Sequence, residues 1–149
     1  MLEHEFLLLS EEQTRTVRER LAGTAELSAA WDRSGLVLPE LTAGQERARE
    51  TVLSVLDRAY GERRKEAVRV RDSLILPRLE RFRAVDTLLD GWLPYRGLNY
   101  YGFTGIPAES IPALEALLRE LARGEEFAPL LALCGAARAA QAWILHCGI

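Results

Sequence analysis

The stretch YRGLNYYGFTGIP, residues 95–107, interrupts a chain that otherwise reads as helices rich in Leu, Ala, Arg and Glu. Within it the side chains of LNYYGFTGI alternate between two faces, as they do in a strand, and aromatic rings fall on both faces. Glycines inside a strand are typical of a bulge or of close approach by another backbone. The stretch therefore predicts a buried strand over residues 98–106, between two helical halves of the chain.

Two further segments with strand character lie at the two ends of the chain. HEFLLL, residues 4–9, is a short apolar run whose length favours a strand. AWILHCGI, close to the C-terminus, is rich in strand-forming residues and too short for a helix of its own. We therefore expect a small sheet of two or three short strands, at about residues 4–9, 98–106 and 142–147, covered on one side by helices.

Four to five helices are predicted around this sheet. Ser10-Glu-Glu-Gln13 has the pattern of a capping box, which predicts a helix that begins at Glu11. Residues 66–76 leave helix and strand open, because V-R-V-R alternates in a strongly charged segment, and helix is favoured. The fold expected is a mainly helical α+β domain spanning residues 1–149, with helices over residues 11–22, 42–61, 77–91, 110–123 and 127–140.

Length, charge and cysteine content argue against several classes of protein. The chain has 149 residues and a net charge of −3, which fits one domain and argues against a general nucleic-acid binder. It shows no signal peptide and no apolar run long enough to span a bilayer. Its two cysteines lack the spacing of a disulfide framework or a CxxC motif. The expected location is the cytoplasm, with reduced thiols.

The sequence carries no motif for a catalytic site or a cofactor. His4 and His146 would lie close together if the terminal strands paired, and with Cys147 and Glu3 or Glu5 they could hold a metal. However, the spacing matches no metal signature, and in a strand His146 and Cys147 point to opposite faces. Cys134 is expected in the core and Cys147 closer to the surface. We therefore predict no metal, no cofactor and, on balance, no enzymatic activity.

The best candidate for a binding site is the segment that leads into the predicted central strand. Tyr, Trp and Arg are the residue types most enriched at binding hot spots, and a loop shaped by Pro94 and Gly97 can present them. These residues favour a non-enzymatic protein-interaction protein, such as an immunity or antitoxin-like inhibitor or a small subunit of a bacterial assembly. The predicted contact residues are Trp92, Tyr95, Arg96, Asn99, Tyr100 and Tyr101.

Two alternative functions use other features. A pocket beside residues 92–101 would favour a small-molecule binder or an enzyme, with Arg96 holding an anion. The basic stretch 58–71 would favour a nucleic-acid-associated subunit, although Glu62 and Glu66 dilute its charge. The residues predicted for this second alternative are Arg63, Arg64, Lys65, Arg69 and Arg71. The partner expected first remains another protein, with self-association as a second option and no membrane.

Overall fold

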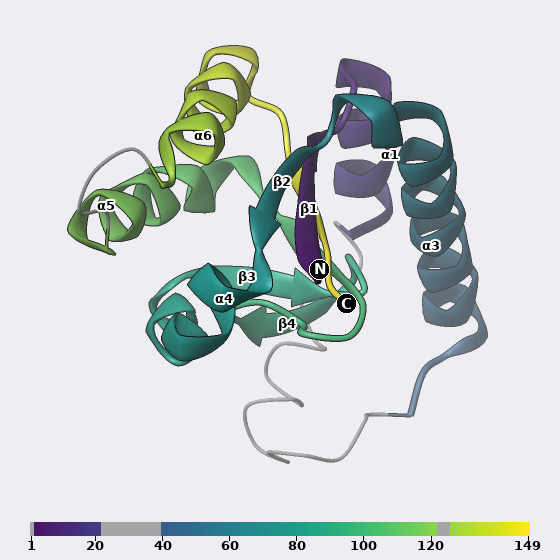
Figure 1. Cartoon of the computed structure of the whole chain (residues 1–149). Coiled ribbons are helices and arrows are strands. Elements are labelled where there is room, and N and C mark those ends of the chain that lie inside the picture. Colours follow the sequence, from purple (N-terminus) through teal and green to yellow (C-terminus); the bar gives the residue numbers. More distant parts are fainter. Residues whose placement is uncertain (1, 22–39, 122–125) are drawn as a thin grey trace.

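The structure is a computed structural model that describes residues 2–21, 40–121 and 126–149. Within these ranges, a six-stranded antiparallel sheet carries helices on both of its faces (Figure 1). The strands are β1 (Glu3–Leu8), β2 (Val68–Arg71), β3 (Asp86–Leu89), β4 (Leu93–Arg96), β5 (Phe103–Ile106) and β6 (Ile144–Cys147). The α-helices are α1 (Glu11–Leu21), α3 (Ala43–Arg63), α4 (Asp72–Ile75), α5 (Ile111–Leu121) and α6 (Ala128–Ala140).

The prediction of a small sheet of two or three strands is wrong. The strand order is β2-β1-β6-β5-β3-β4, and every neighbouring pair is antiparallel. The predicted strands at about 4–9, 98–106 and 142–147 are present as β1, β5 and β6, although β5 begins only at Phe103. The remaining strands come from segments that were predicted as helix or loop. Helices also cover both faces of the sheet, where one covered face was expected.

Strand β2 replaces the helix that was favoured over residues 66–76. Its V-R-V-R alternation is that of a strand: Val68 and Val70 pack toward the core and Arg69 and Arg71 are exposed. The deciding partner is β1, which pairs with β2 in the register His4 opposite Val70. Because β1 lies more than 60 residues away in the chain, the local charge pattern alone favoured the wrong structure.

The hairpin β3–β4 replaces the second half of the helix predicted over residues 77–91. Asp90 and Gly91 both have positive φ, 52° and 79°, and the Trp92 amide donates to the Leu89 carbonyl. This is the backbone of a type I′ turn, which matches the twist of antiparallel strands and favours Asp-Gly. Gly91 therefore lies in the turn of a hairpin and not at the end of a helix. Short 3₁₀ segments occupy most of residues 76–84.

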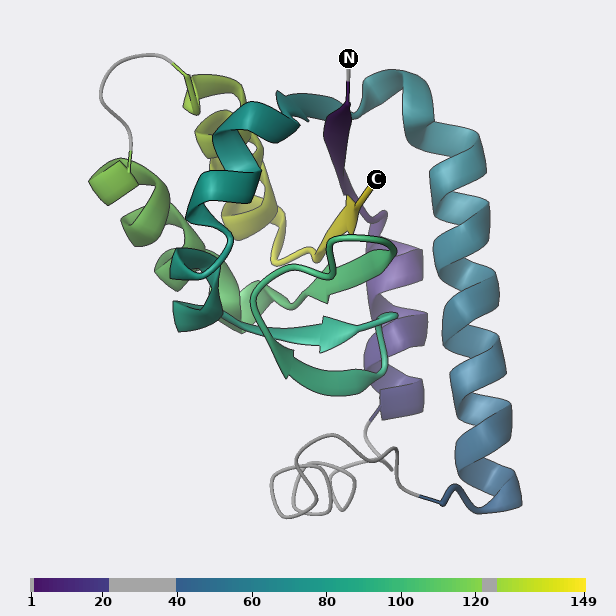
Figure 2. The same cartoon turned by 60° about the horizontal axis from the view of Figure 1, so that its bottom comes forward.

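Two apolar cores lie on the two faces of the sheet. On one face, α5 and α6 pack over β1, β6 and β5 through side chains such as Phe6, Leu118 and Ile144. On the other face, α1 and α3 pack over the same strands through side chains such as Leu7, Leu56 and Leu145. Figure 2 shows α1 and α3 side by side on this second face of the sheet. None of the described helices combines the length and apolar character needed to cross a bilayer.

The capping box at the start of α1 is confirmed. The Gln13 amide donates to Ser10 Oγ at 3.0 Å, and the Ser10 amide donates to Gln13 Oε1 at 2.9 Å. Thr42 and Gln45 form a second capping box at the start of α3. The predicted helices at residues 110–123 and 127–140 correspond to α5 and α6. Local patterns thus identified the four longer described helices, α1, α3, α5 and α6, correctly. Residues 22 and 122–123, at the ends of two predicted helices, lie outside the described ranges.

Candidate functional site

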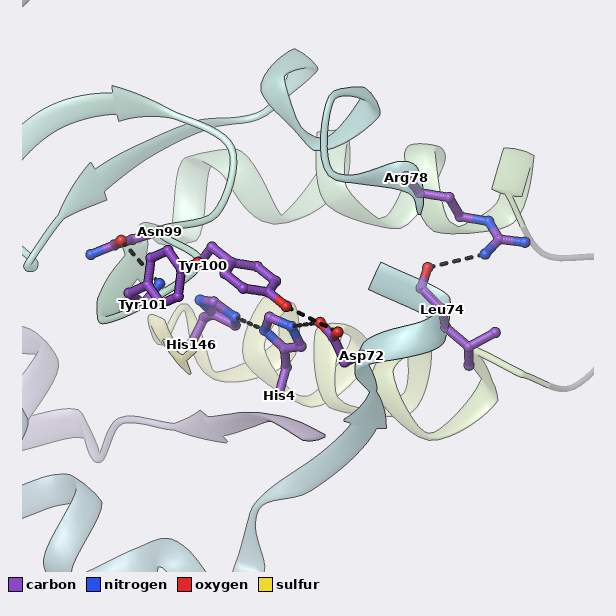
Figure 3. Close-up of polar contacts among 8 residues, drawn as sticks. All are labelled: His4, Asp72, Leu74, Arg78, Asn99, Tyr100, Tyr101 and His146. Atoms are coloured by element: carbon purple, nitrogen blue, oxygen red, sulfur yellow. Dashed lines mark hydrogen bonds and ion pairs between the residues drawn. The ribbon is translucent and has the colours of Figure 1, made fainter. Parts of the chain in front are cut away.

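A pair of buried imidazoles joins the two ends of the chain. β1 and β6 are neighbours in the sheet, with Phe6 opposite His146, so His4 and His146 lie diagonally on the same face. His4 Nδ1 and His146 Nε2 are 2.9 Å apart, and both residues are fully buried (Figure 3). The predicted proximity of the two histidines is therefore confirmed. Their rings are 17° from parallel, with centroids 5.1 Å apart.

Each imidazole has a second polar partner, so the contact extends into a network. His4 Nε2 lies 2.9 Å from Oδ1 of Asp72, the first residue of α4. The Tyr100 hydroxyl donates to the other oxygen of that carboxylate at 2.9 Å. At the other end, His146 Nδ1 lies 3.2 Å from Thr104 Oγ1. We call these five residues, Tyr100, Asp72, His4, His146 and Thr104, the histidine network.

The partners of the network restrict where its protons lie. The Asp72 carboxylate only accepts hydrogen bonds, so His4 Nε2 carries a proton and donates it. If His4 is neutral, its Nδ1 accepts from His146 Nε2–H, and His146 Nδ1 then accepts from the Thr104 hydroxyl. Thr104 Oγ1 itself accepts from the Asn99 amide at 2.7 Å. With both rings neutral, every buried polar atom of the pair has a partner.

Burial determines the charge of His146. Desolvation, followed by the nearby His4, lowers the pKa of His146 from 6.5 to about 3. His146 is therefore neutral at physiological pH. Burial and the hydrogen bond to Asp72 raise the pKa of Tyr100 above its ordinary value of 10. The tyrosine thus keeps its proton and remains a donor to Asp72.

The network is built for structure and not for contact with a substrate. Both imidazoles are 0% exposed, and each ring nitrogen faces another group of the protein. A general base must come within hydrogen-bond reach of a substrate proton, which neither ring does here. Among the described residues, no group of three or more His, Cys, Asp and Glu side chains is arranged to hold a metal.

The residues considered with the histidines for a metal site lie elsewhere. Cys147 follows His146 in β6 and packs on the α3 face of the sheet, where Glu5 also lies. Cys147 is only 5% exposed, which corrects the expectation of a position closer to the surface. Burial, and then the Glu5 carboxylate, raise the pKa of the Cys147 thiol to about 12. Cys134 is buried in the opposite core, as predicted.

The loop between β4 and β5 is fixed at both of its ends. The Asn99 amide donates to Thr104 Oγ1, and the Ile149 amide donates to the Tyr100 carbonyl at 2.8 Å. The Gly148 amide donates to the Gly102 carbonyl at 2.9 Å. A side chain at Gly148 would collide with the Tyr100 carbonyl, so the C-terminal segment and the loop are in direct backbone contact. The predicted close approach of another backbone to a strand glycine is confirmed at Gly105, where a Cβ would lie 3.2 Å from the Cα of Gly91.

This fixed loop presents one side chain almost entirely to solvent. Tyr101 is 80% exposed, although its ring meets the Tyr100 ring edge-on at a centroid distance of 4.8 Å. Two other exposed apolar side chains, Leu2 and Ile149, lie on the ends of β1 and β6 at the same end of the sheet. The Ile149 amide donates to the carbonyl of Tyr100, the residue before Tyr101 in the chain. We call Leu2, Tyr101 and Ile149 the sheet-end patch.

The six residues predicted to contact a partner fall into three different environments. Trp92 is 8% exposed and packs in the core against α3, where the Arg49 guanidinium lies 5.7 Å from its ring centre. Tyr95 and Arg96 lie on the edge strand β4, and Arg96 pairs with Asp86 at 3.6 Å. Asn99, Tyr100 and Tyr101 form the fixed loop. Trp92 therefore packs in the core, which corrects its expected place on a loop, and the other five residues remain predictions.

The basic residues of the nucleic-acid alternative gather at the end of α3 and on β2. Arg64 and Arg69 approach the same oxygen of Glu5 at 3.5 and 3.6 Å. Arg63 donates to the Leu8 carbonyl at 3.0 Å. Lys65 lies close to Glu62 and Glu66 in the sequence. Arg71 lies opposite Glu3 in the β1–β2 register. Internal pairing and adjacent acids weaken the case for a phosphate-binding surface.

The groove found among the described residues does not lie beside the aromatic stretch that the pocket alternative uses. A groove of about 870 Å³ lies between α1 and α3 and is lined by polar and charged side chains such as Glu12, Arg58 and Glu62. None of the six residues between Trp92 and Tyr101 that were proposed as a site lines this groove. Arg96, the proposed anion ligand, is on an exposed strand edge.

Sequence reasoning missed Asp72 and Thr104, which complete the network. Asp72 was hidden because the residues before it were read as a helix, whereas they form β2 and bring Asp72 to the end of β1. Thr104 faces His146 only because β5 and β6 are neighbours in the sheet. Comparison of the chain with protein-family models, curated proteins and solved structures finds no match.

Proposed function

We propose that this chain is a non-enzymatic protein-binding protein of the cytoplasm, of the kind represented by an immunity or antitoxin-like inhibitor or a small assembly subunit. The observation that carries the proposal is Tyr101, which is 80% exposed on a loop held at both ends by hydrogen bonds. A rigid aromatic side chain contributes much contact area and loses little conformational entropy on binding. Leu2 and Ile149 are further exposed apolar side chains at the same end of the sheet.

The buried chemistry supports binding over catalysis. The described histidines lie at full depth in the core, and both thiols have pKa values raised to about 12, first of all by burial. Reactive cysteines and histidines need access to a substrate and pKa values near the working pH. The hydrogen bonds of Asp72 and Thr104 in the histidine network instead hold the loop.

The occupant that fits the sheet-end patch best is a different protein with a pocket for the Tyr101 ring. A standard protein–protein interface buries ~800 Å² per partner, so the sheet-end patch would be one anchor within a larger contact. The two edges of the sheet are protected against pairing with a second copy. β2 exposes Arg69 and Arg71, and β4 contains Pro94, which has no amide proton to donate.

The test begins with a photo-crosslinking amino acid at position 101 in host cells, compared with the same amino acid at Arg47 on α3. A protein that is crosslinked only from position 101 is identified, expressed and titrated against the purified chain. We expect Tyr101→Ala to weaken this binding at least tenfold, with Leu76→Ala as the matched control. Leu76 is 51% exposed but is not part of the patch. Equal affinity of both variants, or a dimer of this chain that depends on Tyr101, would overturn the proposal.

A further inference from the structure

We propose that the histidine network makes the sheet-end patch responsive to pH: acid opens the loop that carries Tyr101 while the two cores remain folded. This inference rests on the function proposed above, because it concerns the regulation of the same surface. It follows from where the protons of the network can be placed and from the fact that the loop is fastened to the network itself.

The geometry of the pair accommodates one additional proton and no more. With His4 as an imidazolium, both of its N–H groups donate, to Asp72 and to His146 Nε2. His146 then donates from Nδ1 to Thr104 Oγ1. A second added proton would leave both His4 Nδ1 and His146 Nε2 protonated across their 2.9 Å contact. Neither nitrogen could then accept a hydrogen bond from the other. Two buried cations at this distance also repel each other.

The surroundings of the pair offer one compensating charge. Asp72 in α4 faces His4, and Tyr100 in the loop is a neutral donor to that same carboxylate. β2 contributes Val68 and Val70 to this face, and β5 contributes the uncharged Thr104. From α6, Arg138 is paired with Glu115, and Cys134 is a thiol whose pKa is raised to about 12. A doubly protonated pair is therefore not neutralised.

The loop is the part of the structure whose movement relieves the pair. The Tyr100 ring lies edge-on to His4 at a centroid distance of 5.4 Å, and its hydroxyl reaches Asp72 (Figure 3). Thr104 links His146 to the Asn99 amide at the start of the loop. His146 itself packs against Phe6 in the core. In the proposed open state, release of residues 99–102 admits water to both imidazoles, while α5 and α6 keep their packing.

Linkage gives the size of the effect. Burial lowers the pKa of His146 to about 3, whereas an imidazole in water titrates near 6.5. If opening hydrates His146, the open state binds a proton that the closed state does not bind between these values. The equilibrium constant for opening then rises about tenfold for each pH unit below about 6.5.

Native-state hydrogen exchange tests this inference without a binding partner. Exchange is measured from pH 7.5 to 4.5 and divided by the intrinsic rate at each pH. We expect the amides of Asn99, Gly148 and Ile149, which donate the hydrogen bonds of the loop contacts, to lose protection by about tenfold per pH unit below 6.5. Amides in the middle of α3 should keep their protection. Circular dichroism over the same range monitors the fold.

Two variants separate the network from a general acid effect. His146→Gln keeps an N–H donor but removes the titration, so protection of the loop should depend little on pH. Tyr100→Phe leaves the buried pair intact and removes the hydrogen bond that fastens the loop to Asp72, one of the two links between the loop and the network. In this variant we expect the loop amides to be weakly protected already at pH 7.5.

Three results would each overturn the inference: constant loop protection down to pH 4.5 in a folded protein, loss of protection in the loop and α3 together, or an equal response in wild type and His146→Gln. Full protection of the loop in Tyr100→Phe at pH 7.5 would remove the link to the network. The outcome is independent of partner binding, so a failure of Tyr101 as a contact residue leaves this result interpretable.

Discussion

His4 and His146 are separated by 142 positions in the chain, yet Nδ1 of the first and Nε2 of the second are 2.9 Å apart. This contact crosses between β1 and β6, two neighbouring interior strands that the ends of the chain contribute. Its hydrogen-bond direction depends on protonation, because both rings are buried and each has one further partner. The tautomers of the two rings are therefore coupled.

This coupling predicts a specific pattern of imidazole protons. His4 Nε2 should be protonated at any pH at which Asp72 is ionised. His146 should be protonated at Nε2 when His4 is neutral and at Nδ1 when His4 is an imidazolium. Long-range ¹H–¹⁵N correlation spectra of the ring nitrogens distinguish these forms. A neutral His4 next to a His146 protonated at Nδ1 would contradict the assignment, since both nitrogens of the 2.9 Å contact would then be acceptors.

The buried His146 also predicts a loss of global stability in acid. Its pKa is about 3 in the folded chain and about 6.5 once the chain unfolds, so the unfolded state binds the extra proton between these values. The free energy of unfolding is therefore unaffected by this group above pH 6.5. Below it, this contribution falls by about 1.4 kcal/mol per pH unit, and the loss ends near pH 3.

Urea denaturation of wild type and His146→Gln between pH 7.5 and 4 measures this contribution. Other groups titrate in both proteins, so the relevant quantity is the difference between the two slopes of unfolding free energy against pH. We expect wild type to fall more steeply by about one proton, or about 1.4 kcal/mol per pH unit below 6.5. Identical slopes would show that His146 is not held neutral by burial.

The proximity of the histidines was predictable, whereas the network around them was not. Short apolar runs at both ends of the chain identified β1 and β6, and pairing of these strands brought His4 and His146 together. Asp72 required β2, whose charged V-R-V-R sequence also fits a solvated helix. Its strand structure is decided by pairing with β1, an interaction between distant residues that no local pattern contains.

The hairpin β3–β4 carried a local signal that was misread. Asp90-Gly91 stands between two pairs of apolar residues, which is a strong short-range indication of a hairpin. The helical spacing of Leu79, Phe82 and Leu89 outweighed it, although these residues lie in a turn, a 3₁₀ segment and a strand, respectively. As a consequence Trp92 was expected on a loop, while its place after the turn directs it into the core beneath α3.

The two thiols are predicted to be unreactive in the folded protein. Burial is the largest cause that raises the pKa of Cys134 and of Cys147 to about 12, so the thiolate fraction at pH 8 is about one in ten thousand. We expect almost no reaction with Ellman's reagent over an hour at pH 8, and complete reaction of both thiols in 6 M guanidinium. Rapid labelling of folded Cys134→Ser would show that Cys147 is accessible and contradict its burial.

Gly148 tests the contact between the C-terminal segment and the loop of Tyr101. A Cβ at this position would overlap the Tyr100 carbonyl and lie 2.7 Å from the Asn99 carbonyl, and backbone atoms cannot move aside as a flexible side chain can. We expect Gly148→Ala to lower the free energy of unfolding by about 1–3 kcal/mol, the range found for overpacked sites. It should also shift the amide resonances of Tyr101 and Gly102, since the same contact holds the loop.

Gly61 provides the matched control, because it lies within α3 and a Cβ there would meet no atom within 4 Å. Replacing a glycine inside a helix by alanine removes an entropic cost, so Gly61→Ala should gain about 0.5–1 kcal/mol. Both variants are compared with wild type by urea denaturation. A stable Gly148→Ala with unchanged loop resonances would mean that the loop is not held against the C-terminal segment, and the fixed presentation of Tyr101 would lose its structural basis.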